Sequence, residues 1–118
     1  MNRPDVINYA GLKFTVRYTP DPYKSWDSWG YVDFAKNQIT IATKSEGKPI
    51  AEISIAQTLL HEVCHIVLEY AGMGGSTDMF EPTNEYLTSL MSSGFTQLYL
   101  QNPDLIEYLN ETFYDETN

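Results

Sequence analysis

The first half of the chain alternates between apolar and polar residues in the way that strands do. Leu12 to Tyr18 place Leu, Phe, Val and Tyr at every second position, with Lys, Thr and Arg between them. A side-chain period of two is typical of a strand with one buried face. Pro20 and Pro22 end this strand, and a polar, aromatic loop with two tryptophans follows over 23–29, which we expect to pack on the core.

The segment Gly30 to Thr43 has the pattern of a β-hairpin. Its two arms, 31–34 and 38–41, flank a turn around Lys36-Asn37. Asparagine tolerates the left-handed conformation that such turns use. A loop over Ser45 to Pro49 then leads into the next element.

The segment Ile50 to Tyr70 predicts a long helix that is apolar around most of its circumference. Its apolar positions are Ile53, Ile55, Ala56, Leu59, Leu60, Val63, Ile66, Val67 and Leu68. Such a girdle is typical of a helix that is buried on nearly all sides.

Two further helices are predicted after the glycines at 72, 74 and 75. Pro82 begins one of them, because proline is favoured at the first helical position, and the helix runs to about Leu100. Asn102-Pro103 stops it. Asn102 or Asp104 caps a short last helix over 105–113, and the tail 115–118 is expected to fray.

These elements predict an α+β fold. A chain of 118 residues, of which 42% are apolar and 14% aromatic, suits one folded domain, residues 1–118. We expect a small sheet from residues 12–43 packed on the helices 50–70 and 82–101.

Charge and composition narrow the functional classes. The net charge is −9, from 16 acidic and 7 basic residues, which argues against nucleic acid as a partner. No apolar run approaches the roughly 20 residues of a membrane span, and no leader peptide is visible. With one cysteine, Cys64, no internal disulfide can form. A cytoplasmic protein with no membrane partner is expected, and its oligomeric state is left open.

The centre of the long helix carries the candidate chemistry. Residues 61–65 read His-Glu-Val-Cys-His, and these are the only two histidines of the chain. Residues four apart lie on one helix face, so His61 and His65 can bind one ion, with Glu62 beside them. This is the HExxH pattern, in which two histidines bind Zn²⁺ and the glutamate is the general base of a metallopeptidase. The alternative is a pair of core histidines bonded to carbonyls, beside a surface glutamate.

A third ligand is needed, because hydrolytic zinc sites commonly use three protein ligands and one water. Cys64 is rotated away from the line joining the histidines and suits a small buried role. Glu69 shares their face, but 61 and 69 are about 12 Å apart along the helix, too far for one ion. Asp78, Glu81 and Glu85 in the returning segment are the candidates, and helical periodicity alone places Glu85 on a solvated face.

The motifs resemble those of a known family. His-Glu-Val-Cys-His, followed twenty positions later by Asn84-Glu85, is similar to the gluzincin arrangement, best known from thermolysin-like peptidases. The chain also resembles small phage and bacterial zincin-like peptidases, sometimes called minigluzincins, in Gly-Tyr-Val-Asp at 30–33, Leu-Leu-His-Glu at 59–62 and Asn-Pro at 102–103. The resemblance spans about Gly30 to Pro103 and implies a zincin-like fold with Glu85 as the third metal ligand.

The resemblance also has consequences for the second helix. If Glu85 reaches the metal, the small polar face of Ser89, Ser92 and Thr96 must be buried against the long helix, with the Leu87–Leu98 side on the C-terminal segment. Two features depart from the larger family. Ser89 stands where an aspartate usually orients a ligating histidine, and no third histidine is present to stabilise an oxyanion.

These inferences predict a zinc endopeptidase acting on a peptide or protein substrate. His61, His65 and Glu85 would hold Zn²⁺, Glu62 would be the base, and a hairpin strand would align the substrate by β-augmentation. The alternative is a catalytically weak or inactive zincin-like module that binds zinc and other proteins. An acidic decoy or inhibitor is a third hypothesis.

Overall fold

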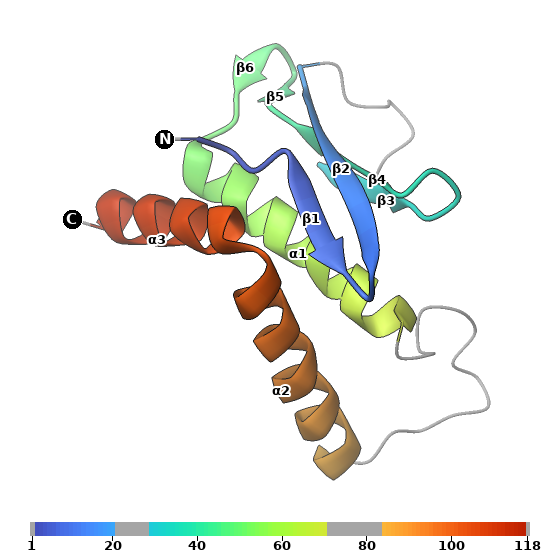
Figure 1. Cartoon of the computed structure of the whole chain (residues 1–118). Helices are drawn as coiled ribbons and strands as arrows, with labels where there is room; N and C mark the ends of the chain where they lie inside the picture. Colours follow the sequence, from blue (N-terminus) through green and yellow to red (C-terminus); the bar gives the residue numbers. More distant parts are fainter. Residues whose placement is uncertain (1, 21–28, 71–83, 118) are drawn as a thin grey trace.

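A four-stranded mixed sheet is the scaffold of the protein (Figure 1). The computed structural model describes residues 2–20, 29–70 and 84–117. The strands are β1 (Val6–Tyr9), β2 (Leu12–Thr19), β3 (Gly30–Asp33) and β4 (Gln38–Ala42), in the order β1-β2-β4-β3. β2 and β4 are parallel, and the two outer strands pair antiparallel to them. With its helices, the sheet confirms the predicted α+β class.

The predicted strands and turn are confirmed where the apolar pattern was clearest. In β2, the buried side chains of Phe14 and Val16 alternate with exposed residues. The β3–β4 hairpin turns at Asn37, whose φ of 50° is the left-handed conformation expected there. The predicted tryptophan loop lies outside the described residues except for Trp29, which is exposed.

The sequence pattern missed two short pairings. β1 forms a hairpin with β2 through Ala10 and Gly11, both at positive φ. β5 (Lys44–Ser45) and β6 (Lys48–Pro49) form a second hairpin, through Glu46 and Gly47 at φ 52° and 79°. Both turns have the two positive φ angles of a type I′ turn. An Ala-Gly or Glu-Gly pair is a weaker signal for it than Asn-Gly.

The predicted long helix is α1 (Glu52–Tyr70), which lies across one face of the sheet (Figure 1). Its buried side chains form the core with those of β1, β2 and β4. β3 approaches α1 closely, because a Cβ placed on Gly30 would lie only 2.8 Å from Thr58 Cγ2. This contact is three residues before His61, so the edge strand of the described sheet runs beside the middle of α1.

The second helix, α2 (Asn84–Gln101), corrects one prediction. Ser89, Ser92 and Thr96 are exposed, so the polar face is not buried against α1. The buried positions are Gly94 and Leu98 on the apolar stripe, and a Cβ on Gly94 would lie 2.5 Å from Val67 Cγ1. Because Gly94 has no side chain, α2 can cross α1 closely at this point. The contact between the two helices is therefore on the apolar side of α2. The predicted start at Pro82 lies outside the described residues.

The part of α2 that precedes the crossing extends away from the rest of the described molecule. Its N-terminal end points away from the sheet and α1 (Figure 1). Tyr86, Met91 and Phe95 are 42–51% exposed. The helix therefore meets the body mainly through its second half.

The third helix, α3 (Pro103–Thr117), is longer than predicted and continues through 115–117, where fraying was expected. Asn102 precedes it in the N-cap position, and its backbone oxygen accepts a hydrogen bond from Ile106 N. Its side chain does not cap the helix. Instead, the buried amide accepts from Asn8 N at 2.7 Å and donates to Asn8 O at 2.9 Å, which ties the α2–α3 elbow to strand β1.

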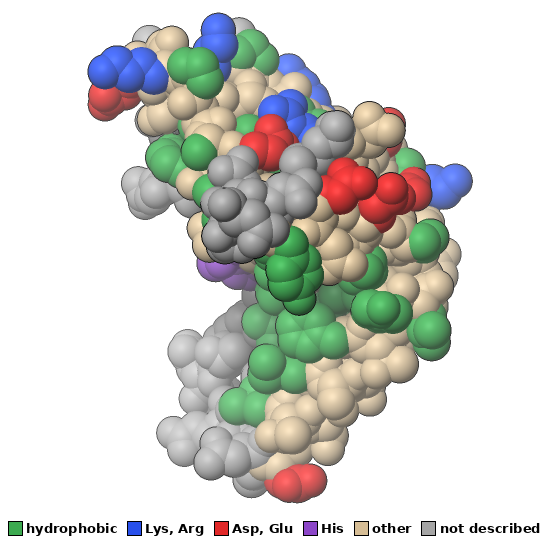
Figure 2. All heavy atoms as spheres, turned by 90° about the vertical axis from the view of Figure 1, so that its left-hand side faces the viewer, with side chains coloured by type: hydrophobic (Ala, Val, Ile, Leu, Met, Phe, Trp, Pro, Cys, Tyr) green, Lys and Arg blue, Asp and Glu red, His purple; other side chains and the backbone are tan. Residues whose placement is uncertain are grey.

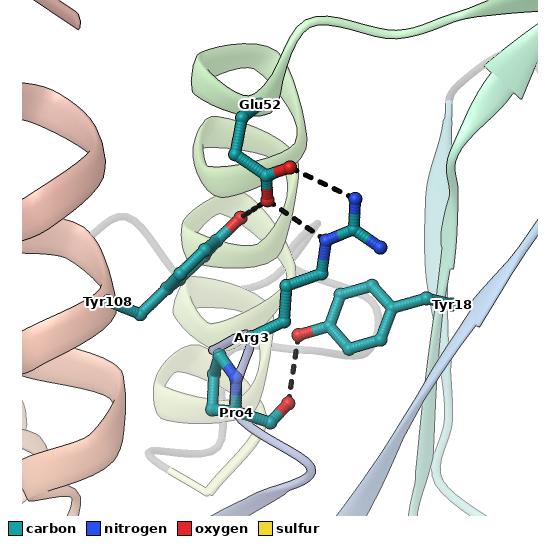
Figure 3. Close-up of polar contacts among 5 residues, drawn as sticks. All are labelled: Arg3, Pro4, Tyr18, Glu52 and Tyr108. Carbon is teal, nitrogen blue, oxygen red and sulfur yellow. Dashed lines mark hydrogen bonds and ion pairs between the residues drawn. The ribbon is translucent and has the colours of Figure 1, made fainter. Parts of the chain in front are cut away.

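A polar network fixes the N-terminal segment to α1 and α3 (Figure 3). Arg3 donates two hydrogen bonds to the carboxylate of Glu52, at 2.9 and 3.0 Å, and Tyr108 OH donates a third at 2.6 Å. The guanidinium also lies 5.2 Å from the ring centroid of Tyr18, whose hydroxyl donates to Pro4 O. Three parts of the chain that are distant in sequence are joined at this carboxylate.

No helix in the described part of the chain is long and apolar enough to cross a membrane.

Candidate metal centre

Helix α1 brings the three predicted residues of its central motif together. His61, Glu62 and His65 form the one group in the described ranges whose ligand atoms are close enough to share a metal ion, all within 4.8 Å of one another. The helical repeat puts the two histidines one turn apart on the same face. That face is exposed, whereas Glu62 is one step round towards the core and only 4% exposed.

The two imidazoles converge on one point. Their Nε2 atoms are 3.2 Å apart, with the ring planes at 78°. Two nitrogens at the usual zinc–nitrogen distance from a tetrahedral ion would be about 3.3–3.4 Å apart. The rings could therefore bind one zinc ion at almost their present separation. The same distance also suits a hydrogen bond between one protonated and one unprotonated Nε2.

The alternative interpretation, two buried histidines beside a surface glutamate, is wrong. His61 and His65 are both exposed, and Glu62, which that alternative put on the surface, is buried. An exposed imidazole can be solvated and does not need an internal carbonyl partner. Burial of the imidazoles therefore does not explain why their two Nε2 atoms lie so close together.

Glu62 lies in an environment that makes it a stronger base than an ordinary glutamate. Burial raises the pKa of its carboxyl, and the nearby His65 and His61 act in the opposite direction. Neither Arg3 nor any other arginine or lysine of the described residues forms an ion pair with it. A buried carboxylate without a cationic side chain is suited to accept a proton from a water beside it.

Cys64 and Glu69 lie as predicted, outside the metal group. Cys64 is half-buried, and burial raises the pKa of its thiol, which favours the protonated form. Glu69 is half-buried in the last turn of α1 and is not a member of the group. Neither side chain contributes a ligand in this arrangement.

Glu85 also stands apart from the group. It is exposed in the first turn of α2 and does not belong to the set of ligand atoms around His61 and His65. The described crossing of α2 with α1 is at Val67, which the helical repeat places about 160° round α1 from His65. The role of Glu85 stays a prediction, and Asp78 and Glu81 lie outside the described residues.

Sequence reasoning did not find the polar strip that continues from the histidines towards the start of α1. Thr58 lies three residues before His61, and Ser54 lies four residues before Thr58, so both are on the histidine side of α1. Both are half-buried, and Thr58 Oγ1 donates to Ser54 O at 2.8 Å. Their spacing from His61 and His65 was the available signal. Because a Cβ on Gly30 would meet Thr58, strand β3 lies beside this strip.

Comparison with protein families, with curated proteins and with solved structures finds no match for the chain. What the geometry shows is a histidine–glutamate–histidine group on α1 that could hold a metal ion.

Proposed function

We propose that the protein is a zinc-dependent peptidase, with His61 and His65 as metal ligands and Glu62 as the general base. The observation that carries this proposal is the 3.2 Å separation of the two Nε2 atoms beside a buried carboxylate. A site that held zinc only for stability would need the two imidazoles. It would gain nothing from a buried glutamate that forms no ion pair with a lysine or arginine of the described residues, because burial opposes its charged form.

Zinc bound at these imidazoles would polarise a peptide carbonyl and lower the pKa of a water molecule. The chain itself would move the proton. Glu62 would accept it from the attacking water and return it to the nitrogen of the leaving amine.

A third protein ligand would come from outside α1, and we keep Glu85 as the first candidate. The spacing of twenty residues from His65 supports it, whereas its exposure does not. Glu81 is the second candidate. Glu85→Ala should weaken zinc binding far more than Glu81→Ala does, and the opposite order would move the assignment to Glu81.

The substrate would be a peptide or protein segment in extended form. β3 is an edge of the described sheet, and it lies against α1 at Thr58, next to the imidazoles. An extended chain added beside β3 would bring its carbonyl groups past the metal group. We therefore propose β3 as the template that aligns the substrate.

One observation favours a second function. Glu85 is exposed and separate from the histidines, and the described residues supply only two imidazoles and Glu62 to a metal. If no third ligand binds, the protein would be a zinc-binding interaction module with weak or no peptidase activity.

The experiment that separates the two functions is cleavage of a mixed peptide library, followed by mass spectrometry, with zinc content measured on the same samples. The enzyme hypothesis predicts cleavage by wild type and none by Glu62→Gln, although both proteins carry zinc. If both carry zinc and the wild type cleaves nothing, the module is the better account. If neither carries zinc, both are wrong.

A further inference from the structure

A large acidic groove lies between the N-terminal segment, the start of α1 and α3. Its volume is about 830 Å³, and its lining includes the carboxylates of Asp5, Glu52, Asp104, Glu107 and Glu111. The cation in the lining is Arg3, and its guanidinium is already bonded to Glu52 (Figure 3). In the described ranges, no ion pair neutralises the other four carboxylates.

An apolar hollow adjoins this groove, and Glu107 and Glu111 line both of them. The hollow has a volume of about 370 Å³ and lies at the α2–α3 elbow, where Tyr99 and Ile106 meet Glu107 and Glu111. Tyr99 is 64% exposed and its neighbour Leu100 is 74% exposed. Figure 2, which faces the end of α3, shows hydrophobic side chains gathered along α2 below a group of acidic ones. Apolar and acidic surfaces are therefore continuous.

The charge of the chain is strongly divided along its length. All seven lysines and arginines precede Pro49, whereas eleven of the 16 acidic residues follow it. The last turn of α3 contains no basic residue, although cations there would stabilise the helix dipole. The part of the sequence after Pro49, which supplies four of the five carboxylates of the groove, therefore contains no lysine or arginine to pair with them.

The groove and the metal centre are on different sides of the molecule. Glu52 and His61 are nine residues apart on α1, and the helical repeat places them about 180° apart round the axis. α3 covers the Glu52 side, while the imidazoles are exposed on the other. A ligand in the groove would not touch the metal group.

We infer that this groove binds a lysine- and arginine-rich amphipathic segment of another protein. An apolar side chain of that segment would enter the hollow of Tyr99 and Ile106, and its cations would pair with Glu107 and Glu111. Charge complementarity identifies the occupant, because a second copy of this acidic chain or a nucleic acid would be repelled. The inference goes beyond the peptidase proposal and does not depend on it.

The test uses the full chain and a fluorescein-labelled synthetic peptide with lysine and leucine at helical spacing, titrated by fluorescence anisotropy. Two matched peptides carry glutamate for lysine or serine for leucine. Wild type should bind the lysine–leucine peptide and neither of the others. Replacing Glu107 and Glu111 together by Gln should weaken binding about tenfold, and Tyr99→Ser should also weaken it.

The control variant combines Glu46→Gln with Glu69→Gln, which removes the same charge outside the groove. It should change the affinity by less than about twofold, because neither side chain lines the groove or the hollow. Four results would overturn the inference. They are equal weakening by the control, equal binding of the serine peptide, displacement of the peptide by millimolar Ca²⁺ alone, or dimerisation of the free protein that Tyr99→Ser abolishes.

Discussion

Helix α1 carries two glutamates, Glu52 and Glu62, whose surroundings shift their pKa values in opposite directions. Glu52, in the first turn, accepts hydrogen bonds from Arg3 and Tyr108, and the Arg3 bonds hold its pKa below the usual range. Glu62, in the middle, is more deeply buried, and that burial raises its pKa. The two carboxyls are ten residues apart on the same helix.

The difference separates a carboxylate with a structural role from the carboxylate to which we assign the role of general base. The Glu52 carboxylate is stabilised by partners from two other segments, so its charge serves to hold the N-terminal segment and α3 on α1. Glu62 has two imidazoles nearby and lies at the edge of an exposed face. A buried carboxylate without a lysine or arginine partner in the described ranges costs stability, and such groups are common at functional sites.

The largest expected effect is on peptide cleavage. Glu62→Gln keeps the shape of the side chain but cannot accept a proton, so we expect activity to fall by about a hundredfold to ten-thousandfold. Glu52→Gln is the matched change at the start of α1. At a temperature where this variant and the wild type are folded, it should leave the cleavage rate within about twofold of the wild-type rate. Rates measured on one cleaved peptide would compare them, and equal losses in both variants would contradict the division of roles.

The next effect concerns strand β3, which lies beside the middle of α1. Gly30→Ala would force a Cβ to within 2.8 Å of Thr58 Cγ2, with Ile41 and the Thr40 carbonyl also near. We expect a loss of about 1–3 kcal/mol in the free energy of unfolding, measured by urea denaturation. Thr58→Ser removes the clashing methyl and keeps the hydroxyl, so adding it should recover part of that loss. If the losses in the free energy of unfolding from Gly30→Ala and Thr58→Ser simply add, the contact between these two residues is not the cause of the Gly30→Ala loss.

A smaller effect should come from the structural carboxylate. Glu52→Gln weakens the bonds to Arg3, and we expect it to lower the free energy of unfolding by about 1–2 kcal/mol, after allowing for partial exposure of the ion pair. Tyr108→Phe removes a single bond and should cost about 1 kcal/mol. Because both changes affect one carboxylate, the double variant should lose less than the sum. Independent losses would argue against a shared network.

The smallest effect is on pH dependence. A carboxyl whose pKa is depressed in the folded state stabilises the protein above its ordinary pKa of about 4.3, and that stabilisation is lost as pH falls through the folded-state value. The gap in stability between wild type and Glu52→Gln should therefore narrow below about pH 4.3. Thermal unfolding from neutral to acidic pH would measure it. A gap that widens on acidification would reverse the assigned sign.

The sequence predicted α1 and its motif well because both depend on local information. The girdle of apolar residues defines a helix, and the four-residue spacing of His61 and His65 brings their side chains together wherever that helix lies. The alternation in β2 and the asparagine turn at Asn37 are equally local, and both are confirmed.

What the sequence could not predict depends on contacts between distant segments. The apolar stripe of α2 identified a helix but not its partner, and the described crossing with α1 at Gly94 leaves Ser89 and Ser92 exposed. The position of Asn102 before Pro103 suggested a cap for α3, whereas its side-chain amide bonds to the backbone of Asn8 and of Leu98. The pairing of Arg3 with Glu52 spans 49 residues and has no local signature. The roles of the site residues stay predictions.

Metal binding by the two histidines is tested most directly by equilibrium dialysis against Zn²⁺ with elemental analysis. Wild type and Glu62→Gln should each bind about one ion per chain, as expected for a single site with two imidazoles. His61→Ala and His65→Ala should each abolish that binding, with the folded state of every variant checked by circular dichroism. Folded His61→Ala or His65→Ala protein that keeps a full equivalent of zinc would contradict the site described here.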